Sequence, residues 1–360
     1  MMLSAGNGFI MQSEKYSRDN AGQSLKKYIL LKQGELAYNH GASKAKQFGC
    51  CYELTEPEAR IPYVYHCFKI NEDEYTPYVA MALNNTKMDQ QLKRLVSSSV
   101  RMDGLLNISF EDYMSVTLHL PSFIEQKHIA DFLTKLDERI AYQERLITSL
   151  KKYKRGAVRQ ILSPKSCPLK NAKWTTAKMS ELGSFVKGAS LSKADISEDG
   201  TPFILYGELY TTYNEVITSI KRRTQAKVDR LYLSRVGDVV IPTSGETPEE
   251  ISTASCVMLS GVILAGDLNI FRSNKVDGRI MSYLLNHVVN AKIARIAQGK
   301  SVVHIQASEL GKLTLSYPDE NTQRTIIDFL SKLDEKIISE ENALTFLTDL
   351  KEGLIQQLFI

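Results

Sequence analysis

One feature constrains the fold of this chain more than any other: a helix-like stretch of sequence occurs twice. FLTKLDERI begins at Phe132, and FLSKLDEKI begins at Phe329, 197 residues later. Aligned without gaps, residues 121–162 and 318–359 are identical at 17 of 42 positions. Each copy starts at a proline, has no further proline and carries one late glycine. The sequence therefore predicts two long, equivalent helices.

Both copies carry a heptad pattern. Steps of four and three residues from Ile129 and from Ile326 land on apolar residues at eight of ten positions in each copy. A helix of about 39 residues spans roughly 58 Å at ~1.5 Å per residue. Because the average helix has only ~11–12 residues, we predict that these two pair as an antiparallel coiled coil. Two amphipathic core helices left by a gene duplication are the alternative.

The polar steps of the two heptad patterns suggest a register for this pairing. If paired residue numbers add to 494, Lys154 faces Glu340. Gln143 then faces Lys351, and the remaining pairs are apolar. The residues expected at this helix pairing are Gln143, Ile147, Leu150, Lys154, Glu340, Leu344, Leu347 and Lys351.

A mixed α/β domain is expected between the two helices, after a linker at residues 163–173. Residues 231–246 (LYLSRVGDVVIPTSGE) predict a strand, a tight turn at Gly237-Asp238, a second strand and a polar loop. Residues 277–301 predict one helix that ends at Gly299.

The N-terminal part repeats this plan faintly. Residues 28–44 (YILLKQGELAYNHGASK) show the same order of strand, turn, strand and polar loop, and residues 74–99 supply the helix. Residues 105–121 match residues 302–318 at the same offset of 197. The predicted fold class is α+β: two mixed α/β domains separated by two long helices, in a pseudo-twofold tandem repeat. The predicted boundaries are 1–120 for the first domain, 121–162 for the first helix, 163–317 for the second domain and 318–360 for the second helix.

The two domains are unequal. The second has an additional stretch, WTTAKMSELGSFVKGASLSKADISEDGTPF, ahead of the point at which the start of the chain aligns with it. We therefore expect a first domain that is truncated at its N-terminus and lacks one or two strands of its sister.

Composition excludes several classes of protein. Hydrophobic residues make up 43% and charged residues 24%, which is ordinary for a globular chain. No apolar run approaches the length that a membrane-spanning helix requires, and the N-terminus lacks the features of a signal peptide. Five cysteines without CxxC spacing predict neither a zinc site nor a disulfide framework, so a cytoplasmic location is expected. The net charge of +4 permits an acidic partner.

Catalytic motifs are not found in the sequence. AQGKS at 297–301 ends like a phosphate loop, but the position at which that motif requires its first glycine is occupied by Ala294. Pro318-Asp319 and Asp334-Glu335-Lys336 resemble the spacing of metal-dependent nucleases, but the second group falls on the predicted helix. The six histidines have neither ligand nor triad spacing. We predict no catalytic residue, no cofactor and no metal site.

With this architecture, the chain resembles the specificity (S) subunit of a type I restriction–modification system. The resemblance is carried by PSFIEQKHIADFLTKLDERI and its echo PDENTQRTIIDFLSKLDEKI, and it is supported by LKQGELAYNHG, RMDGLLNIS and QGKSVVHIQASEL. It implies two target-recognition domains, each reading one half of a bipartite DNA site. It also implies that the helices set the gap between the halves. A helix overlap of about 28 residues gives a spacer of roughly 42 Å, or about 12 base pairs at ~3.4 Å each.

The resemblance also implies partners. They are double-stranded DNA, methyltransferase (M) subunits, two in number, and restriction (R) subunits bound through the M subunits; no membrane is implied. The chain itself is expected to be non-catalytic, because adenine methylation and cleavage belong to these partners. Two alternatives stay open: a truncated or regulatory remnant that binds partner subunits but no complete DNA site, and an unrelated enzyme.

In the second domain, residues 220–235 hold six basic residues and one acidic residue. Since lysine and arginine on phosphates supply affinity and other side chains read base edges, both kinds of residue are candidates. For the basic residues, the alternative is a solvated basic edge without a ligand. Tyr206 and Glu208 can instead be ordinary strand residues, and His304 can have a structural role. The DNA-contact candidates are Tyr206, Glu208, Lys221, Arg222, Arg223, Lys227, Arg230, Thr243, Ser244, Lys300, Ser301 and His304.

The first domain offers candidates in the corresponding loop and turn. Asparagine there can pair with adenine or serve backbone geometry. These candidates are Tyr38, Asn39, His40, Lys44, Lys46, Ser99, Arg101 and Asn107.

Overall fold

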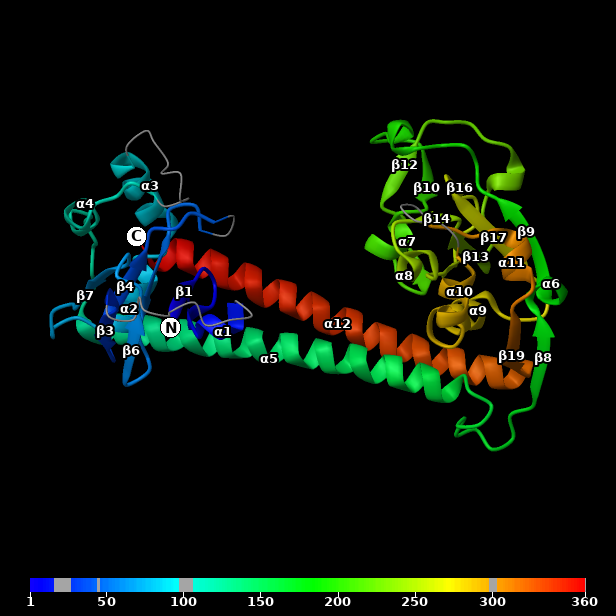
Figure 1. Cartoon of the computed structure of the whole chain (residues 1–360), viewed down its shortest axis with the longest axis horizontal. Coiled ribbons are helices and arrows are strands. Elements are labelled where there is room, and N and C mark those ends of the chain that lie inside the picture. Colours follow the sequence, from blue (N-terminus) through cyan, green and yellow to red (C-terminus); the bar gives the residue numbers. More distant parts are fainter. Residues whose placement is uncertain (16–26, 44–45, 97–105, 298–302, 360) are drawn as a thin grey trace. The chain divides into compact units, whose positions relative to one another are not determined.

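The computed structural model describes residues 1–15, 27–43, 46–96, 106–297 and 303–359. The chain divides into two compact units. The first contains Met1–Arg145 and Glu341–Ile360, and the second contains Leu146–Glu340. Two long helices, α5 (Phe123–Ile161) and α12 (Glu320–Leu358), contribute to both units (Figure 1). The predicted mixed α+β fold with a pair of long helices is confirmed.

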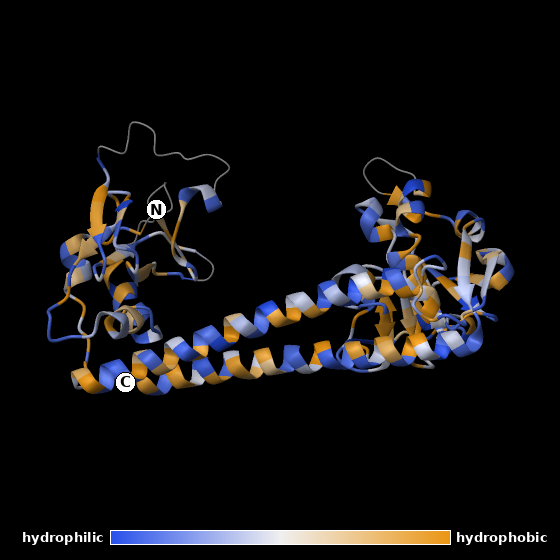
Figure 2. Ribbon diagram, turned by 90° about the horizontal axis from the view of Figure 1, so that it is seen from below, coloured by the Kyte–Doolittle hydropathy of each residue, from blue (hydrophilic) through white to orange (hydrophobic). Residues whose placement is uncertain are grey.

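The heptad pattern of the sequence explains how the two helices pack. Apolar and polar residues alternate along both helices (Figure 2), and within each unit α5 and α12 run antiparallel. In the first unit, Ala130 and Leu133 of α5 pack in one cluster with Leu354 and Leu358 near the end of α12. In the second unit, the end of α5 packs with the start of α12; the residues involved include Val158, Leu162, Ile326 and Leu330.

The predicted register of this pairing is wrong. Lys154 Nζ lies 2.6 Å from Asp334 Oδ1 instead of facing Glu340. Lys351 contacts Asp137 instead of Gln143. In both ion pairs the residue numbers add to 488 (154 with 334, and 137 with 351), six fewer than predicted. The prediction paired the polar heptad positions with one another, whereas Lys154 and Lys351 pair with Asp334 and Asp137, which lie beside the heptad positions.

The first unit contains small antiparallel sheets. Strands β1 and β2 form a hairpin, β3 pairs with β6, and β4 lies between β5 and β7. The elements are β1 (Met2–Ser4), β2 (Gly8–Ile10), α1 (Gln12–Lys15), β3 (Ile29–Lys32), β4 (Leu36–Asn39), β5 (Cys50–Glu53), β6 (Glu58–Ile61), β7 (His66–Phe68), α2 (Thr76–Ala82), α3 (Thr86–Leu95) and α4 (Phe110–Met114).

The second unit has a larger set of sheets. A five-stranded sheet has the order β11-β15-β13-β17-β9 and a three-stranded sheet has the order β12-β10-β16, while β14 pairs with β18 and β19 pairs with β8. The elements are β8 (Trp174–Lys178), α6 (Met179–Leu182), β9 (Gly183–Lys187), β10 (Thr201–Leu205), α7 (Glu208–Thr211), β11 (Val216–Ile217), β12 (Arg222–Thr224), β13 (Asp238–Pro242), β14 (Ser244–Gly245), α8 (Pro248–Ile251), β15 (Ser255–Val257), β16 (Ile263–Ala265), β17 (Leu268–Ser273), α9 (Gly278–His287), α10 (Asn290–Ile296), β18 (Val303–His304), α11 (Ala307–Gly311) and β19 (Thr314–Pro318).

The two units share a three-stranded antiparallel core. In the first, β4 lies between β5 and β7; in the second, β13 lies between β15 and β17. Both central strands follow a glycine with a left-handed φ, Gly34 at +81° and Gly237 at +92°, a conformation that favours glycine. The registers agree as well, because Tyr38 pairs with His66 in the first core just as its counterpart Ile241 pairs with Asn269 in the second.

Three predicted elements differ from the structure. The helix expected over 74–99 is two helices, α2 and α3, because Asn85 caps α3 by accepting the amide N–H of Met88 at 2.8 Å. The helix expected over 277–301 is likewise α9 and α10, and Gly299 lies outside the described residues. The first strand expected in 231–246 is a 3₁₀ turn at Arg230–Tyr232. Among the described helices, none is long and apolar enough to cross a membrane.

Candidate nucleic-acid interface

The second unit contains a groove of about 730 Å³ built from four chain segments. They are residues 187–191 at the end of β9, Thr243 between β13 and β14, the β16–β17 turn at 266–269, and residues 304–308 from β18 into α11. We call it the polar groove, because hydrogen-bonding side chains line it: Lys187, Ser190, Thr243, Asp267, Asn269, His304, Gln306 and Ser308.

Glycines let the walls of the polar groove approach one another. Gly266 has φ +77°, and a Cβ at Gly188 would lie 2.8 Å from the carbonyl oxygen of Gly266. Backbone hydrogen bonds then fix the walls: the Gly188 N–H donates to Leu268 O at 2.9 Å, and the Thr243 N–H donates to Asp267 O at 2.7 Å. The groove is therefore held by main-chain contacts, which leaves its exposed side chains, among them Lys187, Gln306 and Ser308, available to a ligand. Asn269 is 1% exposed and donates to Ile305 O at 3.4 Å, so it supports the groove from within.

Two predicted residues, Ser244 and His304, meet at the polar groove although they are 60 positions apart. Their strands β14 and β18 pair in register at these two residues. Ser244 Oγ lies 2.9 Å from His304 Nδ1 and donates to Asp267 Oδ2 at 3.0 Å. Because the one hydroxyl proton goes to Asp267, Nδ1 of His304 is the donor to Ser244, and in the tautomer with its proton on Nδ1 the ring has Nε2 as an acceptor. The exposed His304 ring can thus accept a hydrogen bond from a ligand.

These three residues do not form a hydrolytic triad. In such a triad the histidine lies between the serine and the carboxylate, whereas here Ser244 lies between His304 and Asp267. Ser244 is also only 6% exposed. Its role is to orient His304, so the prediction that Ser244 itself contacts DNA does not agree with its burial.

Of the two predicted residues in LYGELY, Tyr206 is half-buried against a hydrophobic cluster, and its ring lies next to Gly266, a lining residue of the polar groove. Glu208 is 5% exposed and accepts hydrogen bonds from Leu205 N at 3.0 Å and from Arg222 Nε at 2.6 Å. Both carboxylate oxygens are therefore engaged inside the domain. Glu208 is a structural residue, and the prediction of a DNA contact for it is wrong for this structure.

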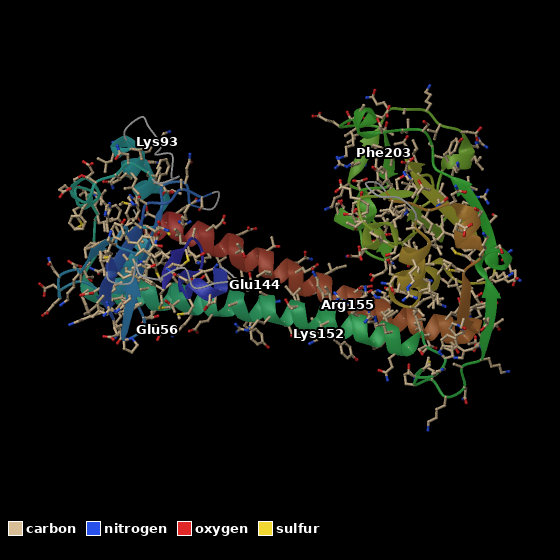
Figure 3. All side chains as sticks on the ribbon, in the orientation of Figure 1. Glu56, Lys93, Glu144, Lys152, Arg155 and Phe203 are labelled. Atoms are coloured by element: carbon tan, nitrogen blue, oxygen red, sulfur yellow. The ribbon has the colours of Figure 1, made fainter. Side chains whose placement is uncertain are left out.

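The basic segment divides into engaged and available residues. Arg222 is paired with Glu208, and Arg223 donates to Gly200 O at 2.9 Å. Arg222 lies opposite Phe203 in the β10–β12 ladder, and Phe203, labelled in Figure 3, is fully buried. Of the predicted basic contacts, Lys221, Lys227 and Arg230 are exposed, and their side chains form neither an ion pair nor a hydrogen bond within the described part of the chain. These three keep their charge for an outside anion.

In the first unit, Tyr38 and Asn39 have structural roles. Tyr38 is 1% exposed, its ring stacks on Tyr113 with centroids 3.8 Å apart, and its hydroxyl donates to Phe48 O at 2.6 Å. Asn39 accepts the Gly41 N–H at 2.9 Å, which is the turn geometry expected as the alternative. The DNA contact predicted for Tyr38 is excluded by its burial in this structure.

The other first-domain candidates are scattered. His40 is buried beside His66, with ring centroids 4.9 Å apart. Lys46 donates to Asn84 O at 2.7 Å, and Asn107 is exposed. Five predicted residues lie outside the described residues: Lys44, Ser99, Arg101, Lys300 and Ser301.

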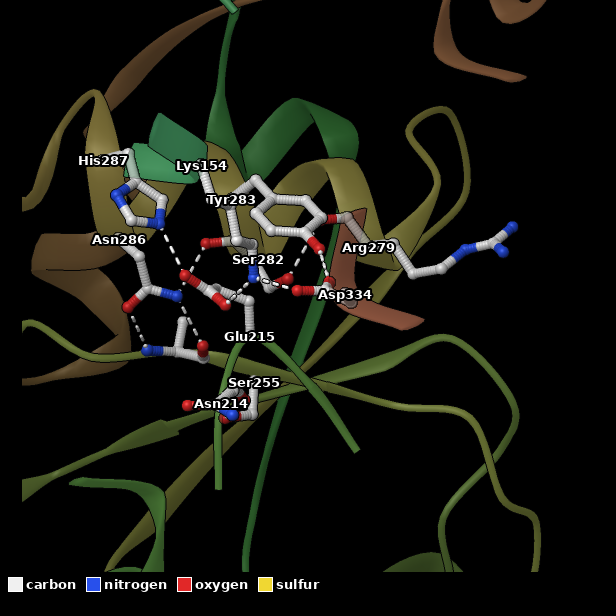
Figure 4. A network of polar contacts seen from close by, with 11 residues as sticks. Lys154, Asn214, Glu215, Ser255, Arg279, Ser282, Tyr283, Asn286, His287 and Asp334 are labelled. Atoms are coloured by element: carbon white, nitrogen blue, oxygen red, sulfur yellow. Dashed lines mark hydrogen bonds and ion pairs between the residues drawn. The ribbon is translucent and has the colours of Figure 1, made fainter. Parts of the chain in front are cut away.

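A buried charge network anchors the second domain on the two long helices (Figure 4). Lys154 of α5 forms ion pairs with Glu215, 2.8 Å away, and with Asp334 of α12, while the ring of Tyr283 lies 5.2 Å from its Nζ. His287 Nε2 lies 2.6 Å from Glu215 Oε1. Burial by itself raises the pKa of Glu215, but the hydrogen bond with His287 and the charge of Lys154 outweigh it and lower that pKa to about 2. Burial lowers the pKa of Lys154, and the two carboxylates raise it above its usual value.

Two carboxylates with the spacing of metal-dependent nucleases, Asp319 and Asp334, have structural roles. Asp319 accepts the Thr322 N–H at the start of α12, and Asp334 neutralises Lys154. Among the described residues, no group of three or more His, Cys, Asp or Glu could hold a metal ion.

Sequence reasoning missed several residues of the polar groove, namely Lys187, Ser190, Asp267, Asn269, Gln306 and Ser308. No local motif marks Lys187 or Asp267, since only the sheet brings them together. Gln306 follows His304 by two residues in QGKSVVHIQASEL, so the position of that motif was a usable signal.

Comparison with known proteins agrees with this geometry. Residues 171–347 match the family model described as the type I restriction modification DNA specificity domain. A comparison with curated protein sequences gave no match.

Solved structures share the fold. A chain from a study titled as complex assembly and conformational transition of the type I R-M system aligns with a TM-score of 0.57 and 15% identity, over 92% of this chain and 82% of that chain. The S subunit from M. genitalium aligns with a TM-score of 0.55 and 15% identity, over 93% of this chain and 85% of that chain. The HsdS subunit from Thermoanaerobacter tengcongensis aligns with a TM-score of 0.47 and 13% identity, over 92% of this chain and 81% of that chain.

The match over 171–347 covers most of the second unit, including every wall of the polar groove. Residues 171–347 therefore belong to the type I restriction modification DNA specificity family. The resemblance to S subunits, predicted from the repeated helices, is confirmed by this match together with the fold.

Proposed function

We propose that this chain is the DNA-sequence-specificity subunit of a type I restriction–modification complex. The observation that carries the proposal is the polar groove: it lies inside the matched specificity domain and is lined by hydrogen-bonding side chains that the fold leaves available. In this proposal the second domain (163–317) reads one half of a bipartite duplex site and the first domain (1–120) reads the other.

Reading and affinity are divided between two sets of residues. Exposed His304 and Gln306, with half-buried Thr243, offer donors and acceptors to base edges, which is how sequence is recognised directly. Lys221, Lys227 and Arg230 are free to contact phosphates, which positions the domain and supplies salt-dependent affinity. Arg222 and Glu208 support this surface from within.

The long helices fix the gap between the half-sites and dock the methyltransferase subunits. This part of the proposal is supported by their length of 39 residues each and by exposed aromatic side chains on their outer faces, such as Tyr142, Tyr153 and Phe346. Adenine methylation and DNA cleavage are assigned to the M and R partners, and the chain itself is non-catalytic. The relative named for the assembly of the type I R-M system is consistent with such partners.

A second function, a remnant that binds partners but no complete DNA site, is favoured by one observation. Tyr38 and His40, the first-domain counterparts of Ile241 and Thr243, are buried, whereas Thr243 lines the polar groove of the second unit. The two functions differ in how many sequence blocks the chain selects.

The test is selection from a pool of random duplexes by the full chain in complex with its methyltransferase subunit. Two short sequence blocks separated by a constant gap are expected, with binding that weakens steeply as salt rises. Replacing Lys221, Lys227 and Arg230 by glutamine should weaken binding to all duplexes and reduce the salt dependence without changing the selected sequence. A single block supports the remnant, and a complex without sequence selection overturns the proposal.

A further inference from the structure

In the second unit, one continuous segment covers two sheet edges. Strand β8 pairs antiparallel with β19, from Thr314 opposite Lys178 to Pro318 opposite Trp174. After the short helix α6, strand β9 pairs with β17, the outer neighbour of the central strand β13. The strand–turn–strand segment 174–187 thus completes both edges, and Met179 and Leu182 between its strands are fully buried in the core.

In the first unit, both equivalent edges have no partner strand among the described residues. β7, the counterpart of β17, is the edge strand of its sheet. Residues 117–121, the counterpart of β19 at the offset of 197, belong to no described strand. Their exposure nevertheless alternates as in a strand, because Leu118 and Leu120 are half-buried while Thr117 and His119 are exposed.

The backbone contacts show which side of this segment is open. In the second unit Met179 N donates to Leu313 O and Asp319 N donates to Lys173 O, both at 2.8 Å. Because hydrogen-bonded pairs recur every second residue, Leu315 and Tyr317 face β8, and their counterparts are Leu118 and Leu120. The described part of the chain provides no hydrogen bond to the backbone of either leucine.

The opposite side of the segment is hydrogen-bonded at Thr117. The Thr117 N–H donates to Gln91 Oε1 at 2.9 Å, and Gln91 Nε2 donates to Thr117 O at 2.9 Å. The side-chain amide of Gln91 thus takes the place of a peptide group there. Along the edge that β8 covers in the sister domain, by contrast, neither Leu118 nor Leu120 has a backbone partner among the described residues, and an exposed strand edge of this kind is a ready template for another strand.

A second observation marks the same place. Helix α4 (Phe110–Met114) is the counterpart of α11 (Ala307–Gly311), on which α6 packs so closely that a Cβ at Gly311 would lie 3.4 Å from Ser180 Cβ. In the first unit no α6 is present among the described elements, and Phe110 and Met114 are 41% and 47% exposed. An open strand edge therefore adjoins an exposed apolar patch, as β8 and α6 adjoin in the sister.

We propose that the first unit binds, in trans, a strand–turn–strand segment of a separate polypeptide with the chemistry of residues 174–187. The segment pairs antiparallel with Leu118 and Leu120, places two apolar turn residues on Phe110 and Met114, and adds a second strand to β7. The sister domain supplies the template, since all three contacts exist there within one chain. Strand addition of this type draws its affinity from main-chain hydrogen bonds and its specificity from alternate side chains.

This inference does not depend on DNA reading, but it has a consequence for it. Residues 187–191, which follow β9, form one wall of the polar groove. In the first unit the same wall would come from the bound segment. A recognition surface in the first domain would then be complete only in the assembled complex.

The test uses the full chain and a labelled synthetic peptide of residues 172–188, with amide hydrogen exchange as the second readout. We expect saturable binding and new protection of the amides of Leu118, Leu120 and β7. Two matched peptides separate strand pairing from general stickiness. A methyl group on the nitrogen of Ala177 removes a ladder donor and should weaken binding by about tenfold or more, whereas a methyl group on the nitrogen of Thr176 should change it by less than about twofold, because that nitrogen points away from β19.

Three results would overturn the proposal. One is no binding at peptide concentrations up to about 1 mM. Another is equal weakening by the two N-methyl groups. The third is protection of the Leu118 and Leu120 amides in the chain without peptide. Such protection would mean that the chain itself or a second copy of it already covers the edge. The molar mass in solution distinguishes cover by the same chain from cover by a second copy.

Discussion

The central strand β13 of the second unit has two further strands beyond its immediate neighbours, whereas β4 of the first unit has its immediate neighbours alone among the described strands. The inner three strands agree in order and register, so the difference lies in what surrounds them. In the second unit the surrounding strands also build the polar groove. The comparison teaches that the shared three-stranded core specifies the fold of a domain. The strands added beside this core specify whether the domain presents a surface that can read DNA.

Two polar contacts are common to both units and show how deep the likeness goes. Buried Gln126 donates to Pro121 O and accepts from Tyr75 N, ahead of α2. Gln323 donates to Pro318 O and accepts from Asp277 N, ahead of α9. Each glutamine therefore ties the start of a long helix to the start of a domain helix.

The second common contact joins a helix to a strand. Asn84 accepts the Cys51 N–H, and its amide donates to Cys51 O and Ala80 O. Asn286 makes the same three contacts with Ala254 and Ser282. These matched devices support the proposed tandem repeat with domains at 1–120 and 163–317.

Equivalent lysines in the two long helices sharpen the comparison most. Lys154 is buried between Glu215 and Asp334, whereas Lys351, its counterpart in the repeated sequence, has a half-buried pair with Asp137. Lys154→Met removes the cation that Glu215 and Asp334 share, which leaves Glu215 with His287 and Asp334 with the Tyr283 hydroxyl. It should lower the free energy of unfolding of the second unit by about 3 kcal/mol. Lys351→Met should cost the first unit about 1 kcal/mol or less. Amide exchange in α9 and in α2 measures the two losses separately, and comparable losses would contradict the buried role of Lys154.

The second expected difference between the two units is the loss of stability in acid. The pKa of Glu215 is lowered to about 2 from an ordinary 4.5, so its ionised form stabilises the folded second unit above that ordinary value. This stability, on the order of 3 kcal/mol, is lost as pH falls from about 4.5 toward 2. Amide exchange of α9 across this range gives the measurement. The Glu215→Gln variant is the control; a loss of the same steepness in that variant would assign the acid sensitivity elsewhere.

A proline at equivalent strand positions tests the open edge. Leu315→Pro removes an N–H that faces β8 and leaves a carbonyl of β8 unpaired, so the second unit should lose about 2 kcal/mol or more. Leu118→Pro removes an N–H that has no partner among the described residues, and the first unit should lose less than about 1 kcal/mol. Thermal unfolding followed by amide exchange distinguishes the two. Equal losses would show that the edge at Leu118 is already paired in solution.

Much of the fold was predictable because its signals are local. The heptad pattern indicated both helices, and the glycine turns indicated the starts of β4 and β13. The helix register was not predictable from the heptad positions alone, because Lys154 and Lys351 pair with Asp334 and Asp137, which lie beside those positions. The split between α2 and α3 has a local signal in Asn85, which caps α3, but the contact of the neighbouring Asn84 with Cys51, 33 positions earlier, is not visible in the sequence.

The candidate site was predictable only in part, for a related reason. Thr243 and His304 were identified in separate turns, and only β14 and β18 bring them together. Asp267 and Lys187 come from segments without any motif. Tyr38 was chosen from its loop, but its stacking partner Tyr113 lies far along the chain, and that contact buries it. Burial made by distant residues is what sequence patterns do not contain.

The most direct test of the central claim is a pair of adenine-methylation maps from cells that express the chain with its methyltransferase subunit. One map uses the natural chain, and the other uses Gln306→Ala, a change at an exposed residue of the polar groove. We predict a motif of two blocks with a constant gap, in which Gln306→Ala alters one block and leaves the other block and the gap unchanged. A motif that does not respond to Gln306→Ala, or one in which both blocks change, would contradict the assignment of the polar groove as the reading surface of one half-site.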